Sequence, residues 1–148
     1  MDRIFANRIG DEWRRGADSR PNINPSDTGE VIGHYARGGA QDVTDAVAAA
    51  RAAFPAWSRF GPMDRHAILM RASADVTARG EQLATLLARE KGKTLADARG
   101  EVGRVAQIRA LHATEAVRRT GETGASIRTG VSVEITREPV GVVGIITP

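Results

Sequence analysis

The feature that most constrains the fold is a run of apolar residues at the end of the sequence. Residues 140–146 read Val-Gly-Val-Val-Gly-Ile-Ile, without one charged or polar side chain. A strand that is apolar on both faces is typical of a parallel sheet covered by helices, so we expect a central strand of an α/β fold. The run continues to Pro148 with no closing turn, and we therefore expect this chain to be the front of a longer protein.

Four amphipathic helices are expected in the middle of the chain. Between residues 42 and 54, apolar side chains recur every three or four positions and form one stripe that must be buried. Pro55 should kink or end this helix, because proline has no amide hydrogen and crowds the carbonyl of Arg51. Similar spacing predicts three further helices over residues 62–80, 81–91 and 94–119.

Short β elements are expected before these helices. Residues 4–9 and 12–14 have β character and flank the turn-forming pair Gly10-Asp11, which predicts a hairpin. Residues 22–29 are rich in turn formers, and strand character resumes over residues 30–35. A hairpin and one further strand should therefore precede the first helix.

A different pattern follows the last predicted helix. Val131, Val133 and Ile135 alternate with polar residues, as in a strand with one buried and one solvated face. Pro139 then interrupts the hydrogen-bond ladder, which places it at a strand end or an exposed edge. Two interpretations remain open for this strand, an ordinary sheet edge or a projecting arm that pairs with another subunit.

The composition argues against two classes of partner. The sequence pI is about 10.1, but 21 basic residues face 18 acidic ones and the basic residues are scattered, so we expect no nucleic acid to bind. No apolar stretch approaches the length of a membrane span or a secretory signal, so we expect no membrane association. The absence of cysteine fits a reducing compartment, and a cytoplasmic protein is the expectation.

Two sets of residues invite a ligand-binding interpretation that the spacing does not support. Lys91-Gly92-Lys93-Thr94 looks like part of a phosphate-binding loop, but that motif needs a glycine at the position of Leu87. The end of one helix at Gly92 and the start of the next at Thr94 explain these residues. The three histidines lie far apart in the sequence, without partners at ligand spacing, so no metal site is expected.

Four stretches of the sequence resemble aldehyde dehydrogenases. They are NPSDTGEVI at residues 24–32, Ala-Phe-x-Ala-Trp at 53–57, Glu-Lys-Gly-Lys at 90–93 and REPVGVVGIITP at 137–148, so the likeness covers nearly the whole chain. The stretch at residues 131–140 looks most like bacterial enzymes that act on semialdehydes such as 2-oxoglutarate semialdehyde. Betaine aldehyde, succinate semialdehyde and plain aliphatic aldehydes remain open as substrates.

The resemblance implies an NAD- or NADP-dependent enzyme that oxidises an aldehyde to a carboxylic acid. In that family a cysteine attacks the aldehyde, hydride passes to the nicotinamide, and a glutamate-activated water releases the acid. This sequence contains no cysteine, and neither the base nor the oxyanion-binding Asn of the family is matched. No catalytic residue is therefore assigned, and we expect the 148-residue chain alone to be inactive.

The resemblance also divides the chain into three parts. Residues 1–122 would supply the N-terminal hairpin and helices of the nucleotide-binding domain. Residues 123–139 would form a β arm for oligomerisation, which implies a homodimer or a homotetramer. Residues 140–148 would be the first central strand of a Rossmann-like sheet, truncated.

Ligand contacts are expected at few positions. Ligands of open α/β sheets bind beyond the carboxyl ends of the strands, and the resemblance carries cofactor contact over to Ile146, Thr147 and Pro148 alone. Some members of the family hold a monovalent cation near the positions matching Ile23 and Glu90, the second of which is then Asp. We interpret Glu90 first as a carboxylate at a helix end, and no metal ligand is assigned.

An alternative from a different class remains. The helices and the β arm could form a non-catalytic interaction module that docks on a partner protein and ends at Pro148. The apolar run at residues 140–146 argues against such a module as a free monomer, because its backbone and side chains would lack cover. The sequence after Pro148 discriminates, because Trp-Asn and a later cysteine would support the enzyme.

Overall fold

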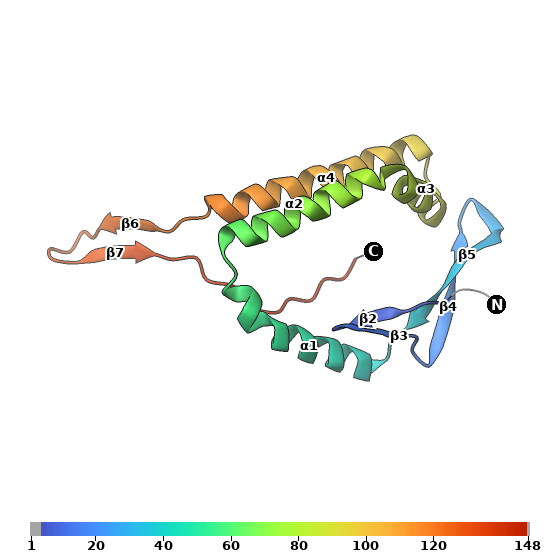
Figure 1. Cartoon of the computed structure of the whole chain (residues 1–148), viewed down its shortest axis with the longest axis horizontal. Coiled ribbons are helices and arrows are strands. Elements are labelled where there is room, and N and C mark those ends of the chain that lie inside the picture. Colours follow the sequence, from blue (N-terminus) through green and yellow to red (C-terminus); the bar gives the residue numbers. More distant parts are fainter. Residues whose placement is uncertain (1–3, 148) are drawn as a thin grey trace.

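The computed structural model describes residues 4–147, and the predicted cofactor contact at Pro148 lies outside them. Strands and helices are arranged as the N-terminal part of an α/β fold, which confirms the predicted class and the four helices (Figure 1). The strands are β1 (Ile4–Phe5), β2 (Asn7–Ile9), β3 (Glu12–Arg14), β4 (Asp18–Asn24), β5 (Asp27–Arg37), β6 (Glu122–Ala125) and β7 (Ser132–Ile135). The helices are α1 (Ala40–Ser58), α2 (Pro62–Ala78), α3 (Gly80–Lys91) and α4 (Leu95–Arg118).

The boundary between α3 and α4 follows the predicted cap residues. Gly92 ends α3 in the left-handed conformation, with φ of 64°. Thr94 then caps α4, because its side-chain oxygen accepts a hydrogen bond of 3.1 Å from the amide of Asp97. These caps confirm that Lys91-Gly92-Lys93-Thr94 is a helix end followed by a helix start.

The structure differs from the expectations for α1 in two ways. Of the two effects expected of Pro55, a kink or an end of the helix, the end does not occur, because the helix continues through Pro55 to Ser58. Proline costs the helix one backbone hydrogen bond, and α1 ends three residues later. The predicted stripe is also not buried, since no residue of α1 is buried and Val43 is 63% exposed. Few of the described residues pack against this helix, so its apolar face has no cover within them.

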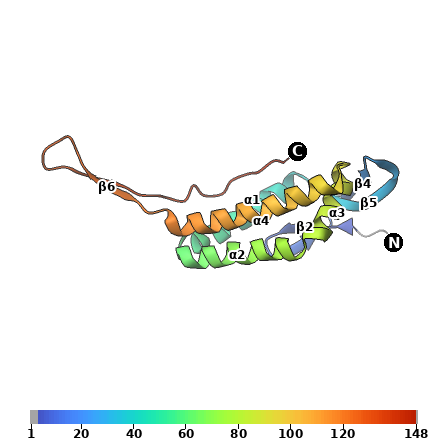
Figure 2. The ribbon, with the colours of Figure 1, turned by 90° about the horizontal axis from the view of Figure 1, so that it is seen from above.

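The helices α2 and α4 lie side by side and form the main packed unit (Figure 2). Within it, the hydroxyl of Ser73 donates a hydrogen bond of 2.8 Å to the carbonyl of Ala106, and His66 Nδ1 lies 2.9 Å from the carbonyl of Ala113. The small side chains of α4 allow this close approach of the two helices. Most of the buried apolar residues in the described chain are alanines. The full set is Ile9, Ala84, Ala98, Val102, Ala106 and Ala113.

The N-terminal residues form a three-stranded sheet in the order β1-β5-β4. The pair β4–β5 is antiparallel, and β1 runs parallel to β5 with Ile4 opposite His34. The sequence missed β4, because its turn formers begin at Asn22 and Pro21 lies within the strand. Pro21 is tolerated within β4 because this strand lies at the edge of the sheet, where a residue can lack an amide hydrogen.

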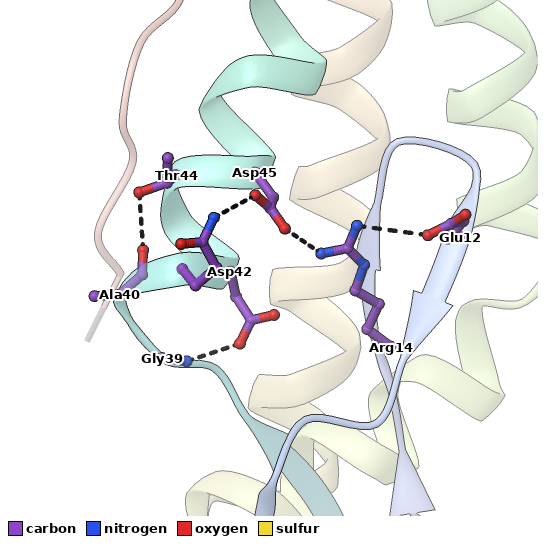
Figure 3. A network of polar contacts seen from close by, with 8 residues as sticks. Glu12, Arg14, Gly39, Ala40, Asp42, Thr44 and Asp45 are labelled. Carbon is purple, nitrogen blue, oxygen red and sulfur yellow. Dashed lines mark hydrogen bonds and ion pairs between the residues drawn. The ribbon is translucent and has the colours of Figure 1, made fainter.

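The predicted hairpin forms between residues 7–9 and 12–14 and is anchored on α1, whereas residues 4–5, expected in its first strand, pair with β5 instead. Gly10 takes a φ of 57° in the turn between β2 and β3. Arg14 on β3 donates a hydrogen bond of 2.5 Å to Asp45 on α1 (Figure 3). The amide of Gly39 also donates to Asp42, at 2.8 Å, and thereby caps the start of the helix. The position of α1 is therefore set from its N-terminal half.

The strands β6 and β7 form a hairpin that projects away from the helices (Figure 1). Every residue of both strands is exposed, and Val133 on β7 is 43% exposed. The expectation of one buried face was therefore wrong for this chain, because nothing in its described part packs on the hairpin. The alternation instead gives the hairpin one apolar and one polar surface, both in solvent.

The expected central strand at residues 140–146 is not formed. Residues 139–147 carry no regular secondary structure, and Val140 is 90% exposed. A strand needs a neighbour to accept and donate its backbone hydrogen bonds, and no described strand lies beside this segment to form a ladder. The strand is therefore absent because it has no partner strand, and its residue types remain those of a central strand.

Two glycine substitutions should have opposite effects on stability. Gly92→Ala should destabilise the chain by about 1–2 kcal/mol, because alanine is strained in the left-handed conformation. Its Cβ would also lie 2.8 Å from Cγ of Pro25. Gly100→Ala in α4 meets no atom within 4 Å and should stabilise the chain by about 0.5–1 kcal/mol.

Urea unfolding followed by circular dichroism measures both effects. A Gly92→Ala chain as stable as the wild type would contradict the assigned cap.

Candidate functional site

The segment at residues 140–147 carries the predicted cofactor contacts. It runs back from the arm between α1 and the pair of α2 and α4 in the view of Figure 1. Ile146 is 99% exposed, and Thr147 is exposed as well. The two residues are consecutive in the sequence, and both stand in solvent. The segment therefore presents an apolar surface to solvent.

The second candidate position, Glu90, lies in the last turn of α3 and faces the N-terminal sheet. Its Oε1 accepts two hydrogen bonds, one of 3.0 Å from the side-chain Nδ2 of Asn22 and one of 2.9 Å from the hydroxyl of Tyr35. Burial raises the pKa of Tyr35, and the hydrogen bond to Glu90 raises it further. Glu90 is thus a partly buried acceptor that joins α3 to both β4 and β5.

These contacts do not favour a cation at Glu90. The oxygen is already bound by an N–H and an O–H donor, which compete with a metal ion for the same lone pairs. Within residues 4–147, no group of three or more His, Cys, Asp or Glu side chains could hold a metal ion. The arrangement supports the interpretation of Glu90 as a helix-end carboxylate with a structural role.

A second carboxylate, Glu30 on β5, makes the reciprocal contact. It accepts a hydrogen bond from Arg89 on α3 and another, of 2.7 Å, from the side-chain Nδ2 of Asn24. The hydrogen bond from Arg89, followed by that from Asn24, lowers the pKa of Glu30. The sheet thus binds the end of α3 through one acid of its own and one acid of the helix.

The remaining candidate features are structural within the described residues. His66 is bound to a backbone carbonyl of α4, and His34 lies on β5. Lys93 donates to Glu101 rather than pointing into an anion site. No helix in this part of the chain is long and apolar enough to cross a membrane.

Comparison with known proteins identifies the architecture. The family model "Aldehyde dehydrogenase family" matches residues 13–148. The chain belongs to the aldehyde dehydrogenase family. The match covers both carboxylate contacts, all four helices, the arm and the apolar segment, so the sequence resemblance is confirmed.

Two bacterial relatives illustrate the similarity in sequence. An alpha-ketoglutaric semialdehyde dehydrogenase from Bacillus subtilis is 34% identical over 97% of this chain and 30% of its own length. A malonate-semialdehyde dehydrogenase from Bacillus licheniformis is 37% identical over 96% of this chain and 30% of its own length. This aldehyde dehydrogenase family member thus spans about a third of the relatives that it matches.

Solved structures agree with the sequence comparison. An NAD-dependent aldehyde dehydrogenase from Sinorhizobium meliloti superposes with a TM-score of 0.86 and 31% identity, over 94% of this chain and 28% of the other. A betaine aldehyde dehydrogenase from Staphylococcus aureus, in complex with NAD⁺, gives a TM-score of 0.82 and 29% identity over 89% of this chain and 27% of the other. The fold of the described residues is that of the N-terminal part of the family.

Several polar residues of this aldehyde dehydrogenase segment could not be singled out from the sequence. The partners Asn22, Tyr35 and Arg89 are separated from their acids by 55 or more positions, so no local spacing reveals the contacts. Glu30 and Glu90 each lie within one of the four stretches that resemble the family, at residues 24–32 and 90–93, and this was the one signal in the sequence that pointed to them.

Acid should weaken the contact between Glu30 and Arg89. The folded-state pKa of Glu30 lies below its ordinary value of 4.5, so the stability from this contact is present above that value and is lost as the pH falls through the folded-state pKa. Glu30→Gln should therefore lower the melting temperature at pH 7, and the difference from wild type should shrink below pH 4.

Thermal melts between pH 7 and pH 3 test this, with Glu134→Gln on exposed β7 as the control. A difference that persists unchanged at pH 3 would show that the charge of Glu30 is not the cause.

Proposed function

We propose that these residues act as the N-terminal part of an NAD- or NADP-dependent aldehyde dehydrogenase that oxidises an aldehyde to a carboxylic acid. The observation that carries the proposal is the family match over residues 13–148, together with the superposition on an NAD-dependent enzyme. On this proposal, residues 1–122 are the start of the nucleotide-binding domain, and residues 140–148 enter its sheet. The nucleophile and the base belong to other parts of the parent enzyme, because this sequence has no cysteine.

We further propose a semialdehyde as the substrate. The support is that the relatives from both Bacillus species are named as semialdehyde dehydrogenases, as is an N-succinylglutamate 5-semialdehyde dehydrogenase from Burkholderia mallei that is 39% identical. A semialdehyde carries a carboxylate beside its aldehyde group. The preference for NAD or NADP stays open, because neighbours of both kinds superpose on this chain.

Cofactor contact is proposed for Ile146, Thr147 and Pro148. Residues 140–146 are apolar on both faces and would enter a parallel sheet once neighbouring strands are present, which places residues 146–148 at its carboxyl edge. The exposure of Ile146 and Thr147 leaves their apolar and main-chain groups available for such contacts. Their role is to bind and orient the nicotinamide nucleotide, which supplies the hydride acceptor when bound.

Self-association through the arm is proposed as well. Val131, just before β7, and Val133 and Ile135 within it form an apolar surface, and these three residues are 43–50% exposed. Exposed hairpin edges of this kind are covered in native assemblies by another strand or subunit. A second copy of the same protein is the occupant that the homo-oligomeric interpretation requires.

The enzymatic proposal is tested on the protein isolated from its host with an antibody to this chain. The isolated material should reduce NAD or NADP in the presence of succinate semialdehyde or 2-oxoglutarate semialdehyde, whereas the recombinant 148-residue chain should show no turnover. Both rates are followed by the absorbance of the reduced nicotinamide. Host protein that is inactive with a panel of aldehydes and both nucleotides would contradict the proposal.

A charged substitution in the apolar surface of the arm tests the proposed self-association. Val133→Asp should abolish self-association, because a carboxylate would be buried without a partner in the interface. Val133→Ile keeps the apolar character and should associate like wild type. Sedimentation equilibrium of the three chains gives the comparison, and unchanged association of Val133→Asp would exclude this surface.

A further inference from the structure

The arm leaves the helical unit at Gly121, where the backbones of its two ends approach each other closely. The helix α4 ends at Arg118, and β6 begins at Glu122, whose partner across the hairpin is Ile135. A Cβ atom placed on Gly121 would lie less than 3.0 Å from the backbone oxygen of Ile135, a separation that real Cβ atoms essentially never show. The obstacle is backbone, so no rotamer change can relieve it.

Among the described residues, few contacts hold the arm besides the backbone hydrogen bonds at the end of α4, such as that of 3.0 Å from the amide of Thr120 to the carbonyl of Arg118. Both of its strands are exposed at every position, so no buried contact orients it. The guanidinium of Arg137 lies 3.9 Å from the carboxylate of Glu122, and both side chains are exposed. Such a pair contributes little, so the close approach of Gly121 to the backbone of Ile135 is a main constraint at the base of the arm.

A small displacement at this close approach is amplified along the hairpin. Moving two strands that lie about 4.8 Å apart by a further ~1 Å rotates the hairpin by roughly 10°, and over about 25 Å this displaces its tip by roughly 4 Å. An interface formed by the arm would be displaced by the same amount. Packed interfaces do not tolerate such a shift, because their contacts depend on close complementarity.

We propose that Gly121 is the positioning residue that sets the direction of the arm, and that any side chain there misdirects it. The part of this inference that concerns association rests on the proposed self-association. The part that concerns the direction of the arm within one chain does not depend on self-association.

The absence of cysteine makes a direct measurement possible. Spin labels on Arg109→Cys in α4 and Thr129→Cys at the tip of the arm report the distance between the helical unit and the tip. A second pair, Arg51→Cys in α1 with Thr129→Cys, detects a rotation that the first pair would miss. Labelled chains are diluted with unlabelled chains, so that pulsed electron resonance reports distances within one chain.

Gly121→Ala should shift the mean distance of at least one label pair by about 3–5 Å and weaken self-association at least tenfold. Gly124→Ala is the matched control, because it lies in the same hairpin and its Cβ would meet no atom within 4 Å. It should change neither the distances nor the association.

The outcomes separate the inference from the proposed function. Unshifted distances in Gly121→Ala overturn the inference, as does loss of helical circular dichroism, which would mean that Gly121 supports the helices rather than the arm. Shifted distances with a wild-type chain that never associates support the positioning role of Gly121 and overturn the proposed self-association. Shifted distances with unchanged association overturn the claim that the direction of the arm sets the interface.

Discussion

The arrangement of the described chain depends on apolar side chains that no other described element covers. No residue of α1 is buried, and residues 140–146 stand in solvent although they are entirely apolar. Burial is confined largely to alanines where α4 packs on α2 and α3, and no large side chain of residues 4–147 is fully buried. Such a helical layer stabilises itself through close backbone approach and leaves its broad apolar surfaces for a further layer. A sheet entered by residues 140–146 would provide that layer.

Polar contacts, rather than a core, attach the N-terminal sheet to the helices. Glu90 accepts from Asn22 and Tyr35, while Glu30 accepts from Arg89, so each element contributes one acid to the junction. Charge-assisted hydrogen bonds of this kind are directional and fix the relative placement of two elements. The placement of the sheet therefore does not depend on the missing apolar cover.

How much the sequence could predict depends on the range of the interactions. The helix ends at Gly92 and Thr94 were predictable, because caps are decided by one or two residues. The strand β4 was missed, because its edge position, which tolerates Pro21, is a property of the sheet and not of the local residues. The run at residues 140–146 has the residue types of a central strand, but a strand also needs a partner, and that requirement is invisible in its own sequence.

How much of the candidate site could be predicted also depends on the range of the interactions. The cofactor contacts proposed at Ile146, Thr147 and Pro148 follow from the family resemblance, and in the structure Ile146 and Thr147 stand in solvent. The junction at Glu90 and Glu30 required the three-dimensional arrangement, because its partners lie far away in the sequence.

The most direct test of the account is the intact mass of this protein in its native host, detected with an antibody to the 148-residue chain. We predict a species several times larger than 15.8 kDa, because the relatives of this chain are more than three times its length. A native species of 15.8 kDa would contradict the account, since the helices and the arm would then serve without the chemistry of an aldehyde dehydrogenase.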